Sequence, residues 1–186
     1  MSNLKWRKLH RQIAPIVFLP LLLSALTGIF YRLGYSWFSL SPEQGKFLMS
    51  VHQGSYLGEQ LKPVYVLLVG LGLLGMIVSG LTMTKLFGSS RPGRTGSKLN
   101  WRKVHRLVAP IIFLPLTVSA VTGLLYRLGR SWLGLSIDQT RIFLIIHQGS
   151  YLGNFFKPIY VLLVGLGLMG MLVTGINMTG IFRRRH

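Results

Sequence analysis

The sequence predicts an all-α membrane protein with four transmembrane helices, and three observations carry that prediction. Half of the 186 residues are hydrophobic and only 13% are charged, whereas a soluble globular domain has about 25% charged residues. Four stretches are apolar over about 20 residues, the length that crosses a bilayer core of about 30 Å. The chain also repeats itself, so we expect the helices in two equivalent pairs.

The repeat covers almost the whole chain. With a constant offset of 95, residues 6–87 match residues 101–182 at 50 of 82 positions without a gap. We therefore divide the chain into repeat one (1–87), a Gly/Ser/Pro-rich linker (88–98) and repeat two (99–186). Each repeat has two spans and so enters the membrane in the same sense, which predicts a pseudo-twofold axis along the membrane normal.

In each repeat the first predicted span contains two prolines and the second is rich in glycine. The four spans lie at about residues 12–31, 64–84, 107–126 and 159–182. Lipid-embedded helices tolerate proline where neighbouring groups satisfy the freed carbonyls, and small residues let helices pack closely. We do not expect a cleaved signal peptide, because the first span lacks a small-residue cleavage site and its copy recurs in mid-chain.

Between its two spans each repeat carries a segment that predicts a short helix at the membrane surface. Ser41 is followed three residues later by Gln44, and Ser136 in the same way by Gln139. Serine at the N-cap with glutamine at the third helical position is a capping box. The interfacial helices that we expect cover about residues 42–56 and 137–151.

Basic residues are unevenly divided between the two faces of the predicted bundle. One face holds 14 of the 21 Lys and Arg residues and no acid. These residues lie in the amino-terminal flank, in the linker and the residues that follow it, and in the carboxy-terminal tail. The other face holds seven, together with the three acids Glu43, Glu59 and Asp138. Because Lys and Arg are enriched in cytoplasmic loops, we predict an integral protein of a bacterial inner or thylakoid membrane with both termini in the cytoplasm.

Composition argues against several classes of function. The formal net charge of +18 does not indicate a nucleic-acid partner, because the basic residues lie between apolar runs rather than on one globular face. The absence of cysteine excludes disulfides, thiolate ligands and iron–sulfur clusters. No ionisable residue lies near mid-membrane, where a transporter would bind its coupling ions.

Four histidines occupy equivalent positions in the two repeats. His10 and His105 begin the first and third spans on the cytoplasmic side, whereas His52 and His147 lie at the opposite face, each in the sequence HQGSYLG. About 20 residues of helix, or roughly 30 Å, separate the two faces. We therefore expect His10 to meet His105, and His52 to meet His147. A single histidine there would be an ordinary interfacial residue, but two symmetric pairs favour ligands.

Two imidazoles at each face suit haem better than other metal centres. Zinc and di-iron sites normally add carboxylates or further histidines, and the three acids are too few. Haem iron needs one or two axial imidazoles, and its propionates need cations. The candidates are Arg32 and Arg127 on the outer side, and Arg11 and Arg106 beside the inner histidines. For any one arginine, snorkelling explains the position equally well.

The repeated HQGSYLG offers further candidates. Gln53 or Ser55 is positioned to accept a hydrogen bond from a histidine ring nitrogen. Tyr56 and Tyr151 are candidate partners of the propionates, and the glycines would let the backbone approach the macrocycle. A turn that ends the preceding helix explains the same residues equally well.

These motifs resemble those of the PepSY-associated transmembrane family, which includes bacterial ferric-siderophore reductases. HRQIAP…SALTG at 10–28 and HRLVAP…SAVTG at 105–123 are similar to its first motif, HRW-x-G-L before a span that closes on TG. Residues 51–80 and 146–175 are similar to its second, LHR-x-LL-x-G before a glycine-rich span. The tryptophan and glycine after HR are absent here, and only about 30 residues separate the first two spans, too few for a PepSY domain.

The resemblance implies b-type haem, two per chain, with His10, His52, His105 and His147 as the iron ligands. The expected function is then a di-haem transmembrane cytochrome that moves electrons across or within the membrane, with reductase activity as one outcome. Its electron donor and acceptor are not identified by the sequence. The alternative is a non-redox assembly or accessory subunit that packs through its glycines and binds lipid, another copy or a partner protein through its basic face.

A reporter that is active only outside the cytoplasm tests the predicted orientation. We expect it to be inactive after Ser89 in the linker and active after Gln44 in the loop, because the positive charge flanking the linker holds that side in the cytoplasm. An active fusion at Ser89 would reverse the orientation.

Overall fold

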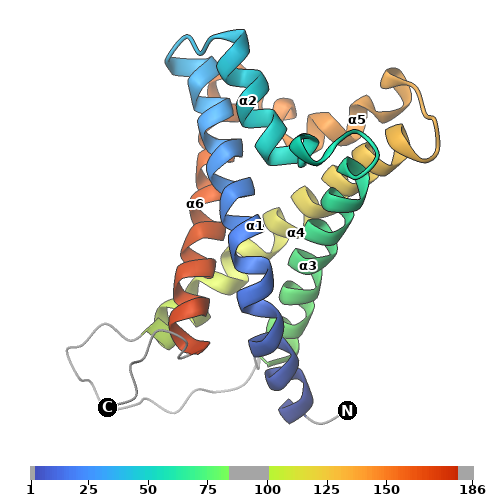
Figure 1. Cartoon of the computed structure of the whole chain (residues 1–186). Coiled ribbons are helices and arrows are strands. Elements are labelled where there is room, and N and C mark those ends of the chain that lie inside the picture. Colours follow the sequence, from blue (N-terminus) through green and yellow to red (C-terminus); the bar gives the residue numbers. More distant parts are fainter. Residues whose placement is uncertain (1–2, 84–100, 180–186) are drawn as a thin grey trace.

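The computed structural model describes residues 3–83 and 101–179, and all of its regular elements are helices (Figure 1). The α-helices are α1 (Asn3–Trp37), α2 (Pro42–Gln53), α3 (Lys62–Met83), α4 (Trp101–Ser131), α5 (Ile137–His147) and α6 (Gly153–Thr179). Two 3-10 turns, Ser55–Leu57 and Ser150–Leu152, follow α2 and α5. The linker at 88–98 and the ends of the second and fourth predicted spans lie outside the described residues.

Four helical segments are long and apolar enough to cross a membrane, which confirms an all-helical protein with four candidate spans. They are Lys5–Trp37, Lys62–Thr82, Trp101–Ser131 and Ser150–Thr179. The first and third extend beyond the predicted spans at both ends. Hydropathy locates the lipid-crossing part of a helix, whereas the helix itself continues through basic and aromatic residues in the headgroup region. Four prolines, Pro15, Pro20, Pro110 and Pro115, lie inside these two helices, as predicted.

The four spans pack as a ring. Helix α1 contacts α3 and α6, and α4 contacts the same two helices. A small core of Ala25, Ile112, Leu116 and Leu168 lies where α1, α4 and α6 meet. Many other large apolar side chains point outward, such as Ile16, which is 74% exposed. This distribution is expected in lipid, because acyl chains solvate apolar side chains as well as a protein core does.

Helices α2 and α5 lie at one end of the ring, opposite the amino-terminal ends of α1 and α4 (Figure 1). Both begin with the predicted capping box. The Ser41 hydroxyl accepts from the Gln44 amide at 3.3 Å and the Gln44 side chain accepts from the Ser41 amide at 3.1 Å. Ser136 and Gln139 make the same two bonds at 3.2 and 2.8 Å. Both short helices therefore begin where the sequence predicts.

Both short helices end earlier than predicted, at Gln53 and His147 instead of residues 56 and 151. The glycine that follows closely in each copy adopts the left-handed conformation, with φ of 72° at Gly54 and 65° at Gly149. This conformation stops an α-helix, and glycine adopts it at the lowest cost because it has no Cβ atom. A Cβ atom at Gly54 would also lie 2.9 Å from the Tyr65 Cβ and closer still to the Tyr65 ring.

Replacing Gly54 by alanine should therefore destabilise the fold more than the same change at another left-handed glycine. Gly134 (φ 63°) has open space around it, and repeat one carries Ser39 (φ 48°) at the equivalent position. We expect Gly134→Ala to cost about 1 kcal/mol and Gly54→Ala about 3 kcal/mol, because the collision with Tyr65 adds to the backbone strain. Thermal unfolding in detergent measures both, and equal losses would show that the Tyr65 contact contributes nothing.

Candidate functional site

A cavity of about 400 Å³ lies between the four spans at the end that carries α2 and α5. All six helices contribute to its walls, and His52 and His147 both line it. Aliphatic side chains form much of the wall, including Ile29 and Leu124 at equivalent positions of the two repeats. Ligand sites commonly have this size, with mostly apolar walls and a few polar groups.

The imidazole rings of His52 and His147 face each other with their centroids 6.4 Å apart and their planes inclined at 62°. Two imidazoles that share one metal through nitrogens at about 2.0 Å have ring centres roughly 6 Å apart. The observed separation therefore has room for one metal ion between the rings. This confirms that the fold brings the two outer histidines together.

Hydrogen bonds determine which nitrogen of each outer histidine carries the proton. His52 Nδ1 lies 3.0 Å from the Ser24 carbonyl oxygen, and His147 Nδ1 lies 2.8 Å from the Ser119 carbonyl oxygen. A carbonyl can only accept, so Nδ1 is the donor in both rings. The Nε2 atom of each ring therefore keeps its lone pair, as a metal ligand requires.

The inner histidines are held in the same tautomer by different partners. His10 Nδ1 lies 2.7 Å from the Ser79 hydroxyl, and His105 Nδ1 lies 2.7 Å from the Thr174 hydroxyl. Each hydroxyl donates its one hydrogen to the carbonyl a turn earlier in its own helix, also at 2.7 Å. It can then only accept from Nδ1–H, which again leaves Nε2 free.

A glycine beside each anchoring residue leaves room for an imidazole ring. A Cβ atom at Gly28 would lie 3.3 Å from His52 Cε1, and one at Gly123 would lie 3.1 Å from His147 Cε1. Gly80 and Gly175 face His10 and His105 in the same way, at 3.7 Å. The inner histidines thus meet a Ser-Gly pair at 79–80 and a Thr-Gly pair at 174–175. In each pair the hydroxyl accepts from the imidazole ring and the glycine leaves space for it.

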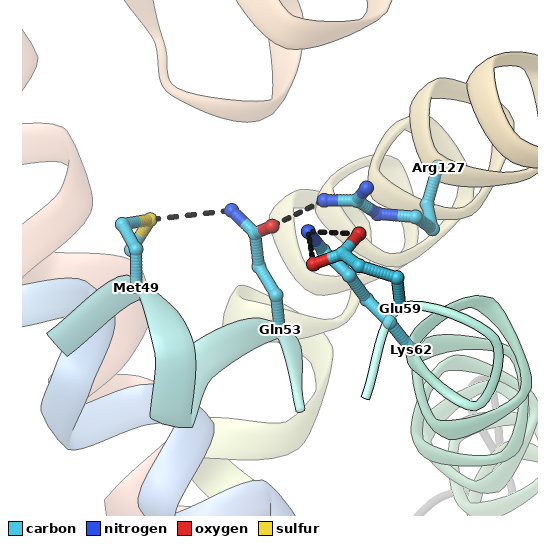
Figure 2. A network of polar contacts seen from close by, with 5 residues as sticks. All are labelled: Met49, Gln53, Glu59, Lys62 and Arg127. Atoms are coloured by element: carbon cyan, nitrogen blue, oxygen red, sulfur yellow. Dashed lines mark hydrogen bonds and ion pairs between the residues drawn. The ribbon is translucent and has the colours of Figure 1, made fainter. Parts of the chain in front are cut away.

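Two arginines reach across the cavity between the repeats. Arg32 Nη2 donates to the Gln148 side-chain oxygen at 2.8 Å, and Arg127 Nη2 donates to the Gln53 side-chain oxygen. All four side chains line the cavity. Figure 2 shows Gln53 between Arg127 and the sulfur of Met49, to which its amide nitrogen donates at 3.5 Å. The predicted outer cations are thus at the cavity wall.

The structure corrects two expectations about HQGSYLG. The His52 ring is held by the carbonyl of Ser24, 28 residues earlier, whereas Gln53 holds Arg127. Tyr56 is 58% exposed and packs edge-on against Tyr65, and Tyr65 lines the cavity in its place. Repeat two has the same arrangement, with Tyr151 59% exposed against Tyr160. Tyr65 and Tyr160 were missed because they lie inside the predicted apolar spans.

The inner candidates are arranged differently from the outer ones. His10 and His105 are not part of the cavity wall. Arg11 and Arg106 are exposed at the end of the bundle that carries the start of α1 and α4. In the part of the chain that the structure describes, no cluster of three or more His, Asp or Glu side chains could hold a metal. The outer cavity therefore offers one pair of imidazoles, His52 and His147.

Burial keeps the outer histidines neutral. The pKa of His52 falls from 6.5 to about 4, first because the ring is removed from water and second because His147 is close. Burial also lowers the pKa of His147, against a smaller opposite effect of its bond to Ser119. Both rings line the cavity. A neutral imidazole is the form that binds a metal.

Comparison with known proteins identifies one relationship. The sequence profile of the PepSY-associated TM region matches residues 39–141, more than half of the chain. The matched part contains α2, α3, α4 and the start of α5, and with them His52 and His105. No curated protein and no solved structure matches the chain.

Acid should destabilise the folded, ligand-free protein through His52. Its pKa is about 4 in the folded chain and about 6.5 when unfolded, so the unfolded chain binds more protons between these values. The free energy of unfolding should therefore be fully retained above about pH 6.5 and fall by on the order of 1–3 kcal/mol as the pH drops towards 4. Thermal unfolding at a series of pH values measures this fall. The same fall in a His52→Gln variant would exclude His52 as its cause.

Proposed function

The chain belongs to the family of the PepSY-associated TM region, and from that premise we propose that it is a transmembrane cytochrome with two b-type haems. One observation supports this most strongly. His52 and His147 face each other across a cavity at 6.4 Å, each with Nδ1–H bound to a helix carbonyl and Nε2 free. Metal-binding histidines commonly donate their second nitrogen to a carbonyl in this way.

The donor set and the cavity fit haem. Haem takes one or two axial imidazoles. The outer cavity supplies two neutral ones without a carboxylate, and the proposed inner site would supply two more. The walls are largely aliphatic, with a glycine beside each outer histidine. Arg32 and Arg127 at the wall provide positive charge for two propionates, which arginine binds in bidentate fashion.

Held by His52 and His147, a haem would supply one-electron chemistry, because two imidazole ligands would leave no position for another ligand. The residues of the chain would provide the other features of the site. Its apolar wall excludes water, the Ser24 and Ser119 carbonyls fix the ring orientation, and the two arginines favour the reduced iron by their charge. Electron transfer is therefore the proposed activity, and reduction of an external acceptor is the reaction it would support.

We assign the second haem to His10 and His105. Ser79 and Thr174 hold these rings with Nε2 free, as the two carbonyls do at the outer site. The two repeats would share one orientation about a pseudo-twofold axis along the membrane normal, with both termini in the cytoplasm of a bacterial inner or a thylakoid membrane. Two haems near opposite faces, separated by roughly 30 Å of helix, would then carry electrons across most of the bilayer.

Visible spectroscopy of the protein purified from haem-replete cells tests the proposal. We expect a Soret band and about two haems per chain. The double variant His52→Ala, His147→Ala should lose about half of the haem and keep a reducible inner site, because the two sites share no ligand. The matched variant His10→Ala, His105→Ala should keep only the outer haem.

Three results would contradict the proposal in different ways. A protein without a Soret band would not be a cytochrome, and the non-redox accessory subunit would then be the better explanation. Two haems retained in the His52→Ala, His147→Ala variant would show that other residues bind them. Loss of both haems from a variant that still folds, as judged by helical circular dichroism, would show that the sites depend on each other.

A further inference from the structure

Two arginine–glutamine pairs join the repeats across the cavity. Arg32 Nη2 donates to the Gln148 side-chain oxygen at 2.8 Å, and Arg127 Nη2 donates to the Gln53 side-chain oxygen (Figure 2). All four side chains are half-buried and line the cavity. Each glutamine directly follows the outer histidine of its own repeat in the sequence. Each repeat therefore supplies one ring of the facing pair and the partner of the other repeat's arginine.

The partner of each arginine is neutral. Within residues 3–83 and 101–179, neither Arg32 nor Arg127 forms an ion pair with an acid. Glu59, the acid that acts on Arg127, is itself paired with Lys62 at 3.2 Å. Arg130 acts on Arg127 with the opposite charge. A glutamine oxygen accepts a hydrogen bond without carrying charge, so both guanidinium groups keep their positive charge at the cavity wall.

Each guanidinium group also keeps a complete edge for a further ligand. It carries five N–H groups in one plane, and two neighbouring pairs of these can each bind both oxygens of a carboxylate. Nη2 contributes one of its two hydrogens to each pair, and the glutamine oxygen accepts one of them. The other pair stays whole. Each arginine can therefore bind a carboxylate without releasing its glutamine.

The glutamines restrict the arginines before any ligand binds. Arginine has no acceptor atom, so each amide must turn its oxygen towards the guanidinium group. At Gln53 the other end of the amide is held as well, because its nitrogen donates to Met49 Sδ at 3.5 Å. A long side chain loses rotamer freedom when it binds a ligand. A bond that already holds the side chain removes part of that cost.

We propose that Gln53 and Gln148 are positioning residues for a carboxylate ligand in the cavity, and that each holds the other repeat's arginine ready for one propionate of the outer haem. This rests on the proposed function. Glutamate would hold the same arginine but offset its charge and repel the propionate. A neutral amide orients the arginine and leaves its charge for the ligand.

A double-mutant cycle tests the positioning role. The parent protein carries His10→Ala and His105→Ala and so keeps the outer haem alone, and the rate of haem transfer to excess apomyoglobin is measured. We expect Gln148→Leu, and likewise Gln53→Leu, to speed the loss about tenfold, as expected for one hydrogen bond to a charged group. After Arg32→Leu, adding Gln148→Leu should change the rate less than about twofold, because no arginine is left to position. A tenfold effect that persists without Arg32 would overturn the proposal.

The variant Gln148→Glu separates positioning from a contact that only joins the repeats. Glutamate binds Arg32 more strongly than glutamine does, so a purely structural contact predicts that haem is held at least as well as in the parent. The proposal predicts faster loss. Haem dimethyl ester lacks both carboxylates, so the parent, Gln148→Leu and Gln148→Glu should all lose the ester at equal rates.

Three further results would overturn the proposal and leave the cytochrome assignment intact. They are unchanged haem loss in Gln148→Leu, unchanged or slower haem loss in Gln148→Glu, and differences between the variants that persist with the ester. A parent protein that binds no haem would instead overturn the proposed outer haem and these positioning roles with it.

Discussion

The hydrogen bond at Nδ1 is the constraint on which the site depends. Each of the four described histidines donates from Nδ1 to an oxygen that a neighbouring transmembrane helix holds in place. The bond selects the tautomer, stops the ring from rotating and leaves Nε2 as the free lone pair. Without it, an imidazole between apolar helices would have two interchangeable nitrogens and no preferred direction. The Nδ1 hydrogen bonds of His52 and His147 also fix how these two rings face each other across the cavity.

The membrane environment explains why these oxygens are available. In lipid, a backbone carbonyl must be satisfied inside the protein, and the Ser24 and Ser119 carbonyls serve the rings as well as their helices. Ser79 and Thr174 satisfy a carbonyl and a ring at once through one hydroxyl. A glycine beside each ring provides space. The cost of removing histidine from water is therefore offset by short, geometrically fixed bonds rather than by charge.

Local patterns in the sequence predicted the elements well, and contacts distant in sequence were harder to predict. The capping boxes at Ser41 and Ser136 and the four spans depend on residues within one or two helical turns, so pattern alone located them. The partner of His52 lies 28 residues away and that of His10 lies 69 away. Gln53, adjacent to His52, was the natural expectation for that partner, but its side-chain oxygen accepts from Arg127 instead.

Low-temperature electron paramagnetic resonance of the oxidised, haem-replete protein tests the central claim most directly. If both irons are held between two imidazoles with free Nε2 atoms, the spectrum should contain only low-spin ferric signals, because no coordination position stays open. A high-spin ferric signal of comparable intensity from the intact protein would show an iron with an unfilled axial position. That result would contradict the pairing of His10 with His105 and of His52 with His147 as haem ligands.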